Sequence, residues 1–398
     1  MIYLAMKIGE YMSIDDYKDL PLLSDAPENI PLFIPNIPAG AIDEISTSLN
    51  SRWIGQGPKV ELFEKLFSSN FLNNHPTVSV SSGTAALHLA YIAAGIKEGD
   101  EVLCPVFTCT ATNIPLLYLK AKIIFVDIDP LTMNISIQDL RNKITDKSRA
   151  IVVVNYGGLP CEMDEINKVA RENNLNVISD NAQALGAEYK GIPIGLTSDI
   201  SIYSFQAIKH ITTGDGGMIG LNEKFHDKTE FLKRIRWFGI DRSGKQKGIW
   251  ENDISEIGFK YQMTDLSASL GISGIGSFQS TLAHRRKILS IYEKLLGKNN
   301  DVGIIGHTND NSVHAAWLFT IKVKDRKNLQ LKLRERNIES NQVHFRNDRY
   351  SIFKNQSNMG TEFPNMDSIQ DDYLVLPLHT KMTESDVQRI CNEINSGW

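Results

Sequence analysis

Short apolar segments alternate with stretches of helical character from about residue 77 onward. Several of these segments are continuous valine and isoleucine runs, which are typical of strands buried on both faces by helices. The expected strands are Thr77–Ser81, Glu101–Val106, Lys122–Asp127, Ala150–Tyr156, Asn176–Asp180, Ile200–Phe205 and Gly217–Leu221. The pattern therefore predicts an α/β fold built on a mainly parallel seven-stranded sheet.

Helical stretches separate these strands. They are expected at Thr84–Gly95, Thr110–Leu119, Ser136–Ile144, Met163–Asn173 and Glu223–Arg236. Functional residues of such sheets gather at the carboxyl ends of the strands. The segments expected there are Ser81–Thr84, Phe107–Thr112, Asp180–Gln183 and Ser204–Lys209.

The pattern changes after about residue 280. A helix that opens at His284 and ends near Gly297 precedes a polar segment, Asn299–Asn311, which we expect to be a loop. The remaining expected elements are a strand at Val313–Val323, a helix at Arg326–Asn337, a strand at Leu374–Leu378 and a helix at Thr383–Asn395. This mixture predicts a smaller α+β domain. Because 398 residues exceed one ordinary compact unit, we expect an N-terminal extension at 1–30, a large domain at 31–280 and a small C-terminal domain at 281–398.

Composition excludes several functional classes. With 42 basic and 47 acidic residues the net charge is −5, so no basic face for nucleic acid or an acidic membrane is expected. The four cysteines do not have metal-ligand spacing, and we expect no metal site. They are Cys104, Cys109, Cys161 and Cys391. Apolar runs are too short for a membrane span, and Lys7 and Glu10 interrupt the N-terminus, which therefore makes a poor signal peptide. We expect a soluble cytoplasmic protein.

A lysine and an aspartate, each just past or at the end of a buried strand, suggest specific chemistry. Lys209 follows the apolar segment Ile200–Phe205, and Asp180 ends the strand Asn176–Asp180. Pyridoxal phosphate requires such a pair: a lysine amine forms a Schiff base and later moves a proton, while a carboxylate keeps the pyridine nitrogen protonated. The pair therefore predicts a site for this cofactor.

Nearby small residues are suited to the cofactor's phosphate. The turn Ser81–Ala86 opens a helix, where backbone amides and the helix dipole favour an anion, and the hydroxyl of Ser204 is also available. Taken alone, each motif has an ordinary structural interpretation: a strand-to-helix turn, a capping aspartate or a surface lysine. Their combination favours the cofactor site. His210 could be a second acid–base group, but neighbouring side chains usually point in different directions, which favours a structural role.

Several motifs together resemble the DegT/StrS family of sugar aminotransferases, which have the type I (aspartate aminotransferase) fold of pyridoxal phosphate enzymes. The matching segments are Trp53–Pro58, Ser82–Ala90, Phe125–Asp129, Asp180–Ala187, Ser204–Gly217 and Gly258–Asp265. The resemblance extends from about Pro31 to the C-terminus, and the motifs occur in the family's order.

The resemblance implies a role for each matching residue. Lys209 corresponds to the Schiff-base lysine, Asp180 to the partner of the pyridine nitrogen and Gln183 to the residue near the ring hydroxyl. Residues of the phosphate cradle correspond to Gly83, Thr84 and Ser204. Family members are homodimers with active sites at the subunit interface, and a residue of the segment 258–263 reaches the partner's cofactor phosphate. We assign that role to Lys260.

Three positions depart from the family's pattern. Many relatives have an aromatic residue that stacks on the cofactor ring where this chain has Cys109, with Phe107 two residues away. Many have asparagine at the position of Lys260 and histidine at the position of Asn155. A lysine would bind a phosphate as a point charge.

The resulting prediction is an aminotransferase that transfers an amino group, from glutamate, to a nucleotide-linked keto-sugar through the Lys209 Schiff base and a pyridoxamine intermediate. One alternative is a sugar dehydratase of the same fold; such relatives have histidine in place of the lysine, so Lys209 argues against it. A second is a non-catalytic regulatory or sugar-sensing protein, which would have lost Lys209 or Asp180. A cysteine desulfurase would need a cysteine in a mobile catalytic loop, and none is evident.

Overall fold

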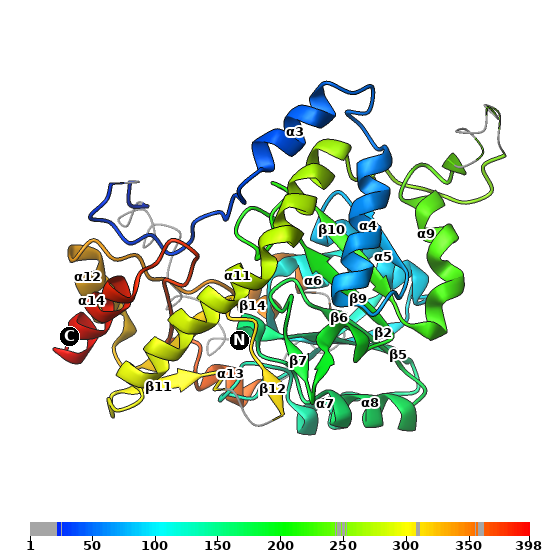
Figure 1. Cartoon of the computed structure of the whole chain (residues 1–398). Coiled ribbons are helices and arrows are strands. Elements are labelled where there is room, and N and C mark those ends of the chain that lie inside the picture. The colour runs from blue at the N-terminus through cyan, green and yellow to red at the C-terminus, as the bar shows by residue number, and fades with distance from the viewer. Residues whose placement is uncertain are drawn as a thin grey trace.

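The computed structural model describes residues 22–24, 26–242, 244, 248, 251, 253–307, 311–354, 356 and 362–398 (Figure 1). Most of the predicted extension at 1–30 therefore lies outside the described residues. Among the described residues, every helix is too short or too polar to cross a membrane.

A seven-stranded sheet forms the centre of the larger part of the molecule. Its strands are β1 (Thr77–Val80), β2 (Glu101–Pro105), β4 (Lys122–Val126), β5 (Ser148–Val154), β6 (Asn176–Asp180), β9 (Ile200–Ser204) and β10 (Gly217–Leu221). Their order is β1-β10-β9-β6-β5-β2-β4. β10 pairs antiparallel with β1 and β9, and the other pairs are parallel. The predicted sheet is confirmed, and the ends of its strands differ from the predicted ones by at most two residues.

Helices cover both faces of this sheet (Figure 1). They are α3 (Ala41–Leu49), α4 (Pro58–Phe71), α5 (Gly83–Ala93), α6 (Thr110–Tyr118), α7 (Ile137–Lys143), α8 (Met163–Glu172) and α9 (Thr229–Ile235). Two consecutive residues of β5 show the arrangement: Val152 packs in the cluster that includes α5 and α6, and Val153 packs in the cluster that includes α7 and α8. The predicted helix Glu223–Arg236 is divided into a 3-10 segment, η3 (Glu223–Lys228), and α9.

The smaller part contains an antiparallel sheet with helices against it. Its strands are β11 (Val302–Ile305), β13 (Phe319–Val323) and β15 (Tyr373–Leu376), and its helices are α12 (Arg326–Glu335) and α14 (Glu384–Asn395). Short elements elsewhere are β3 (Phe107–Thr108), β7 (Glu188–Tyr189), β8 (Ile192–Pro193), β12 (Ser312–Val313), β14 (Phe345–Arg346), α13 (Pro364–Asp367), η1 (Tyr156–Gly158), η2 (Ile194–Leu196), η4 (Asn347–Arg349) and η5 (Ser351–Phe353). The fold is that of a large α/β part with a mainly parallel sheet and a smaller α+β part, as predicted.

The helix predicted to open at His284 begins much earlier. α11 extends over 32 residues, from Asp265 to Leu296, and passes through position 280, where the domain boundary was predicted. Its first half is rich in glycine and serine, which weakens the helical pattern in the sequence. Packing explains the glycine at position 271, because a Cβ atom there would lie 2.7 Å from the ring of Phe63 on α4. The close approach of α4 and α11 therefore requires glycine.

Two further predictions in the smaller part were wrong. The segment expected as a loop, Asn299–Asn311, contains the strand β11. The expected strand Val313–Val323 is interrupted, because Ala316 has a positive φ of 54°. The backbone N–H groups of Ala315 and Trp317 donate to the carbonyls of Gly158 and Gly157, at 2.9 Å each. The interruption thus places Trp317 against the carboxyl end of the large sheet.

Candidate active site

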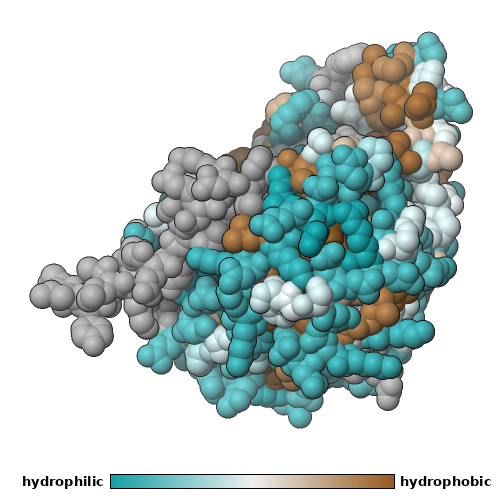
Figure 2. Space-filling model, turned by 90° about the vertical axis from the view of Figure 1, so that its left-hand side faces the viewer, coloured by the Kyte–Doolittle hydropathy of each residue, from teal (hydrophilic) through white to brown (hydrophobic). Residues whose placement is uncertain are grey.

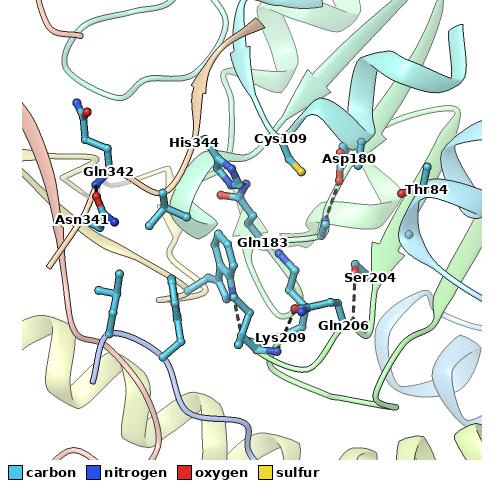
Figure 3. Close-up of a pocket in the computed structure, with 18 of the residues that line it drawn as sticks. Thr84, Cys109, Asp180, Gln183, Ser204, Gln206, Lys209, Asn341, Gln342 and His344 are labelled. Atoms are coloured by element: carbon cyan, nitrogen blue, oxygen red, sulfur yellow. Dashed lines mark hydrogen bonds between the residues drawn. The ribbon is translucent and has the colours of Figure 1, made fainter. Parts of the chain in front are cut away.

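A cavity of about 1030 Å³ lies at the carboxyl ends of the large sheet's strands and is closed by residues of the smaller part. Six of the predicted site residues line it, as the close-up in Figure 3 shows for most of them. They are Gly83, Thr84, Asp180, Gln183, Ser204 and Lys209. The seventh, Lys260, does not line this cavity; its exposed side chain lies with Nζ 5.1 Å from the ring centre of Phe238.

Asp180 is the buried carboxylate of the site. It ends β6 beside Ile202 of β9, because these two strands pair in parallel. One carboxylate oxygen accepts a hydrogen bond from the hydroxyl of Thr112 (2.8 Å) and the other from the backbone N–H of Ala182 (3.1 Å). Burial raises the pKa of the Asp180 carboxyl, whereas these hydrogen bonds and the charge of Lys209 lower it. The donors thus hold one orientation of the carboxylate, and the sequence reasoning missed Thr112 as its partner.

The start of α5 forms a concave surface of backbone amides. Ser82 caps the helix, with its hydroxyl accepting from the N–H of Ala85 at 3.1 Å. Gly83 and Thr84 begin the helix, and the first N–H groups of a helix have no carbonyl partner within it. A Cβ atom at Gly83 would lie 2.9 Å from the Cβ of Ser204. The absence of a side chain therefore keeps the space between the helix start and the Ser204 hydroxyl open for an anion.

Lys209 lies in the cavity between the two parts of the molecule. Burial lowers the pKa of its ammonium group from the ordinary value to about 8; Asp180 and Cys109 act in the opposite direction, and the charge of Arg285 adds to the lowering. Its Nζ atom lies 3.6 Å from the ring centre of Trp317. A lysine in this environment can lose its proton near neutral pH and act as a nucleophile or base.

Gln183 connects the large sheet to the smaller part. Its carbonyl oxygen accepts from the N–H of Gly157 at 2.7 Å, and its Nε2 lies 3.1 Å from Nε2 of His344. Burial and the charge of Lys209 lower the pKa of His344 to about 3, so this imidazole is neutral. Neither Trp317 nor His344 was predicted, because each is more than a hundred residues from Lys209 in the sequence and lacks a local motif.

The three departures from the family's pattern have distinct surroundings. Cys109 is exposed and lines the cavity. Phe107 packs instead on Tyr156 and Tyr373, with ring centres 5.3 Å away in both cases, and does not line the cavity. Asn155 is buried, with its Nδ2 donating to Oδ1 of Asn181 at 2.7 Å.

His210, next to Lys209, does not line the cavity. Its Nε2 lies 2.7 Å from the carbonyl oxygen of Ala315, in a buried position. Burial lowers its pKa well below the ordinary value. The side chain therefore links the two parts of the molecule, which agrees with the structural role that the sequence favoured.

A model of the DegT/DnrJ/EryC1/StrS aminotransferase family matches residues 35–395 of the chain.

The chain belongs to this family.

Curated and solved relatives match over almost their full length. GDP-perosamine synthase of Escherichia coli O157:H7 is 32% identical over 370 residues, which are 92% of this chain and 98% of that protein. The solved sugar aminotransferase CalS13 of Micromonospora echinospora is 31% identical, with a TM-score of 0.86 over 93% of this chain and 100% of that chain. The PLP-form of Spr1654, a putative sugar aminotransferase of Streptococcus pneumoniae, is 27% identical, with a TM-score of 0.87 over 92% and 98%.

These matches confirm the predicted family, the type I fold and the enzyme class: the chain is a sugar aminotransferase that depends on pyridoxal phosphate. The cavity fits this cofactor. It combines a buried carboxylate at Asp180, a lysine whose amine can lose its proton, and a helix start that only a residue without a side chain leaves open beside Ser204.

The cradle at Gly83 generates a direct prediction. In Gly83→Ala the new methyl group would press against Ser204, so we expect the dissociation constant for pyridoxal phosphate to rise at least about tenfold, as loss of one charge-assisted contact would produce. Equilibrium dialysis with absorbance detection measures this. Gly276→Ala is the control, because a Cβ atom there meets nothing within 4 Å and its affinity should not change. Equal affinities of the two variants would contradict the cradle.

Proposed function

We propose that this enzyme transfers the amino group of glutamate to the keto group of a nucleotide-linked sugar. The observation that carries the proposal is the meeting of Lys209, Asp180 and the helix start at Gly83 in one cavity. The nucleotide-linked substrate is supported by GDP-perosamine synthase, a relative at 32% identity whose name includes a nucleoside diphosphate. Glutamate as donor is proposed from the family resemblance.

Each residue has a defined task in this reaction. Pyridoxal phosphate, when bound, withdraws electrons from the substrate carbon that loses a proton. Nζ of Lys209 would hold the cofactor between turnovers and, once released, would accept a proton from the donor substrate and return it. Because burial lowers its pKa to about 8, a larger share of Lys209 is neutral near neutral pH than of an ordinary lysine.

Asp180 supplies the negative charge of the site. Its carboxylate faces the cavity with its oxygens oriented by Thr112 and Ala182, so it can hold a proton on the pyridine nitrogen. The backbone amides of Gly83 and Thr84 and the hydroxyl of Ser204 bind the phosphate. Gln183, which is held by Gly157 and His344, would contact the ring hydroxyl of the cofactor.

We further propose a homodimer in which Lys260 binds the cofactor phosphate of the partner subunit. Lys260 is exposed in the single chain, and a side chain that contacts a partner subunit must be exposed there. Exposed apolar residues include Phe238, whose ring lies beside Lys260, and Ile257, three positions before it. Ile42 on α3 and Ile54 in the segment that follows α3 are also exposed. Figure 2 shows apolar residues gathered at its upper edge, at the height of α3 in Figure 1. An exposed apolar surface of this kind favours association between subunits.

A cytoplasmic location is also proposed. All four cysteines are free thiols, and Cys104, Cys161 and Cys391 are buried. Buried free thiols without disulfides are typical of proteins from a reducing compartment.

The function is tested with a set of nucleotide-linked keto-sugars and glutamate. We expect formation of 2-oxoglutarate together with a sugar product whose mass corresponds to replacement of the keto oxygen by an amino group. Borohydride should link the cofactor covalently to Lys209, as peptide mass spectrometry detects, and Lys209→Ala should bind the cofactor without turnover. A label on another lysine, or full activity of Lys209→Ala, would contradict the assignment.

Asp180→Asn should fold normally but react slowly. Loss of one oriented charge at the reacting centre is expected to reduce turnover by about two to three orders of magnitude. Because the Asp180 charge raises the pKa of Lys209, the substitution should also shift the basic group in the pH–rate profile toward lower pH. Asp164→Asn, at an exposed carboxylate, is the control. Turnover of Asp180→Asn within a few-fold of the wild type would refute the role.

Lys260→Ala tests the shared active site. Removal of a charge–phosphate contact between subunits should raise the dissociation constant for pyridoxal phosphate and make dimer stability depend on added cofactor. Analytical ultracentrifugation with and without pyridoxal phosphate measures both effects, with the exposed Lys298→Ala as control. If Lys260→Ala keeps its cofactor through dilution and dialysis as the wild type does, Lys260 has no part in phosphate binding.

A further inference from the structure

Three aromatic rings from distant parts of the chain stack beside Lys209. The Trp317 ring lies 6.0 Å from the ring of Phe33 at an interplanar angle of 21°, and 6.1 Å from the ring of His344 at 20°. All three residues line the cavity, although Trp317 is only 1% exposed. The rings therefore form a rigid aromatic wall of the active site.

The position of the Trp317 indole is determined by the backbone on both sides. Its Nε1 donates to the carbonyl of Ile208, the residue before Lys209, at 3.2 Å. Its own backbone N–H donates to Gly157 at 2.9 Å, and its carbonyl accepts from Arg285 at 3.0 Å. Because the Trp317 indole is bonded to Ile208, the residue before Lys209, its position is tied to that of the lysine.

The face of this indole is in contact with the lysine ammonium. Nζ of Lys209 lies 3.6 Å from the centre of the Trp317 ring, well within the range of a cation–π interaction. The charged and titratable groups around Nζ are Asp180 on β6, Cys109 before α6, Arg285 on α11 and His344. His344 is neutral, and the guanidinium of Arg285 donates to backbone carbonyls of the 316–317 segment and of Leu378.

Phe33 supports the indole from the N-terminal segment. Two oxygens of the Glu339 carboxylate accept hydrogen bonds from the backbone N–H groups of Leu23 (2.6 Å) and Leu32 (2.8 Å). Nε2 of His379 lies 3.0 Å from the carbonyl oxygen of Pro31. Phe33 precedes residue 35, where the match to the family model begins, so one ring of the wall comes from outside the matched residues.

We propose that Trp317, supported by Phe33, is a positioning residue whose ring face holds the Lys209 ammonium while the lysine is released from the cofactor and carries a proton. The proposal rests on the proposed function, since it gives Lys209 two positions: one on the cofactor and one on the indole. Tryptophan is the strongest of the aromatic side chains for this contact. The indole stabilises the protonated amine, so that Lys209 keeps its proton in the cavity until it is delivered.

The proton affinity of Lys209 tests this role. The full-length protein, saturated with pyridoxamine phosphate so that Lys209 is free, is labelled with a trace of acetic anhydride from about pH 6 to about pH 11, a range that spans shifted and ordinary lysine pKa values. Peptide mass spectrometry gives the labelling of Lys209 relative to exposed Lys298, and the pH midpoint is the pKa of Lys209. The variants are Trp317→Phe, Trp317→Leu and Phe33→Leu.

We expect the midpoint to fall in the order wild type, Trp317→Phe, Trp317→Leu, with a total shift of about one pH unit for loss of a desolvated cation–π contact. Phe33→Leu should produce a smaller shift in the same direction. Phe319→Leu removes the stack between Phe319 and Tyr292, whose ring centres are 4.6 Å apart, and should lower the melting temperature without moving the midpoint. Trp317→Phe and Phe33→Leu keep apolar volume, so they test the proposal even if Trp317→Leu does not fold.

Coinciding midpoints for the wild type and the Trp317 variants would overturn the proposal, and so would a midpoint that moves equally in Phe319→Leu. Binding of pyridoxamine phosphate is measured separately by equilibrium dialysis. Failure of the wild type to bind it would overturn the proposed function, whereas the order of the Lys209 midpoints would still decide the role of Trp317.

Discussion

The charge of Asp180, buried at the end of β6 within the electrostatic reach of Lys209, is the constraint on which the active site depends. A carboxylate in this position is costly unless donors and an opposite charge surround it. Thr112, Ala182 and Lys209 meet that requirement from three separate segments. The parallel pairing of β6 with β9 brings the segments of Ala182 and Lys209 together, and α6 adds Thr112. The order of the strands therefore determines the electrostatics of the site.

The large part of the fold was predictable because its signals are local. Short apolar segments, several of them continuous valine and isoleucine runs, identified each strand of the main sheet. The motifs at their carboxyl ends contained the six predicted site residues that line the cavity. The first half of α11 was missed because its glycines weaken the helical pattern, although Gly271 and Gly274 are required by the close approach of Phe63 and Ile211. β11 was missed because it lies within a polar segment.

The rest of the site could not be read from the sequence for a different reason. Trp317 reaches the cavity only because the chain reverses its conformation at Ala316 and bonds to Gly157 and Gly158. A continuous strand over 313–323, which the apolar pattern favours, would have carried Trp317 elsewhere. Similarly, His344 is identified as a site residue only by its contact with Gln183, which is 161 residues away in the chain. Such contacts are properties of the folded state.

The hydrogen bonds that the Glu339 carboxylate accepts from Leu23 and Leu32 make the N-terminal segment part of the structure around the active site. The Glu339 side chain is 11% exposed, and its charge is compensated by these two amides together with Arg334, whose Nη1 lies 4.0 Å from Oε1. A protein shortened to residues 35–395 would contain every residue that the family model matches. It would lack Phe33 from the cavity wall and the two amides that donate to Glu339. In this chain the active-site cavity therefore includes a residue that lies before the start of the family match.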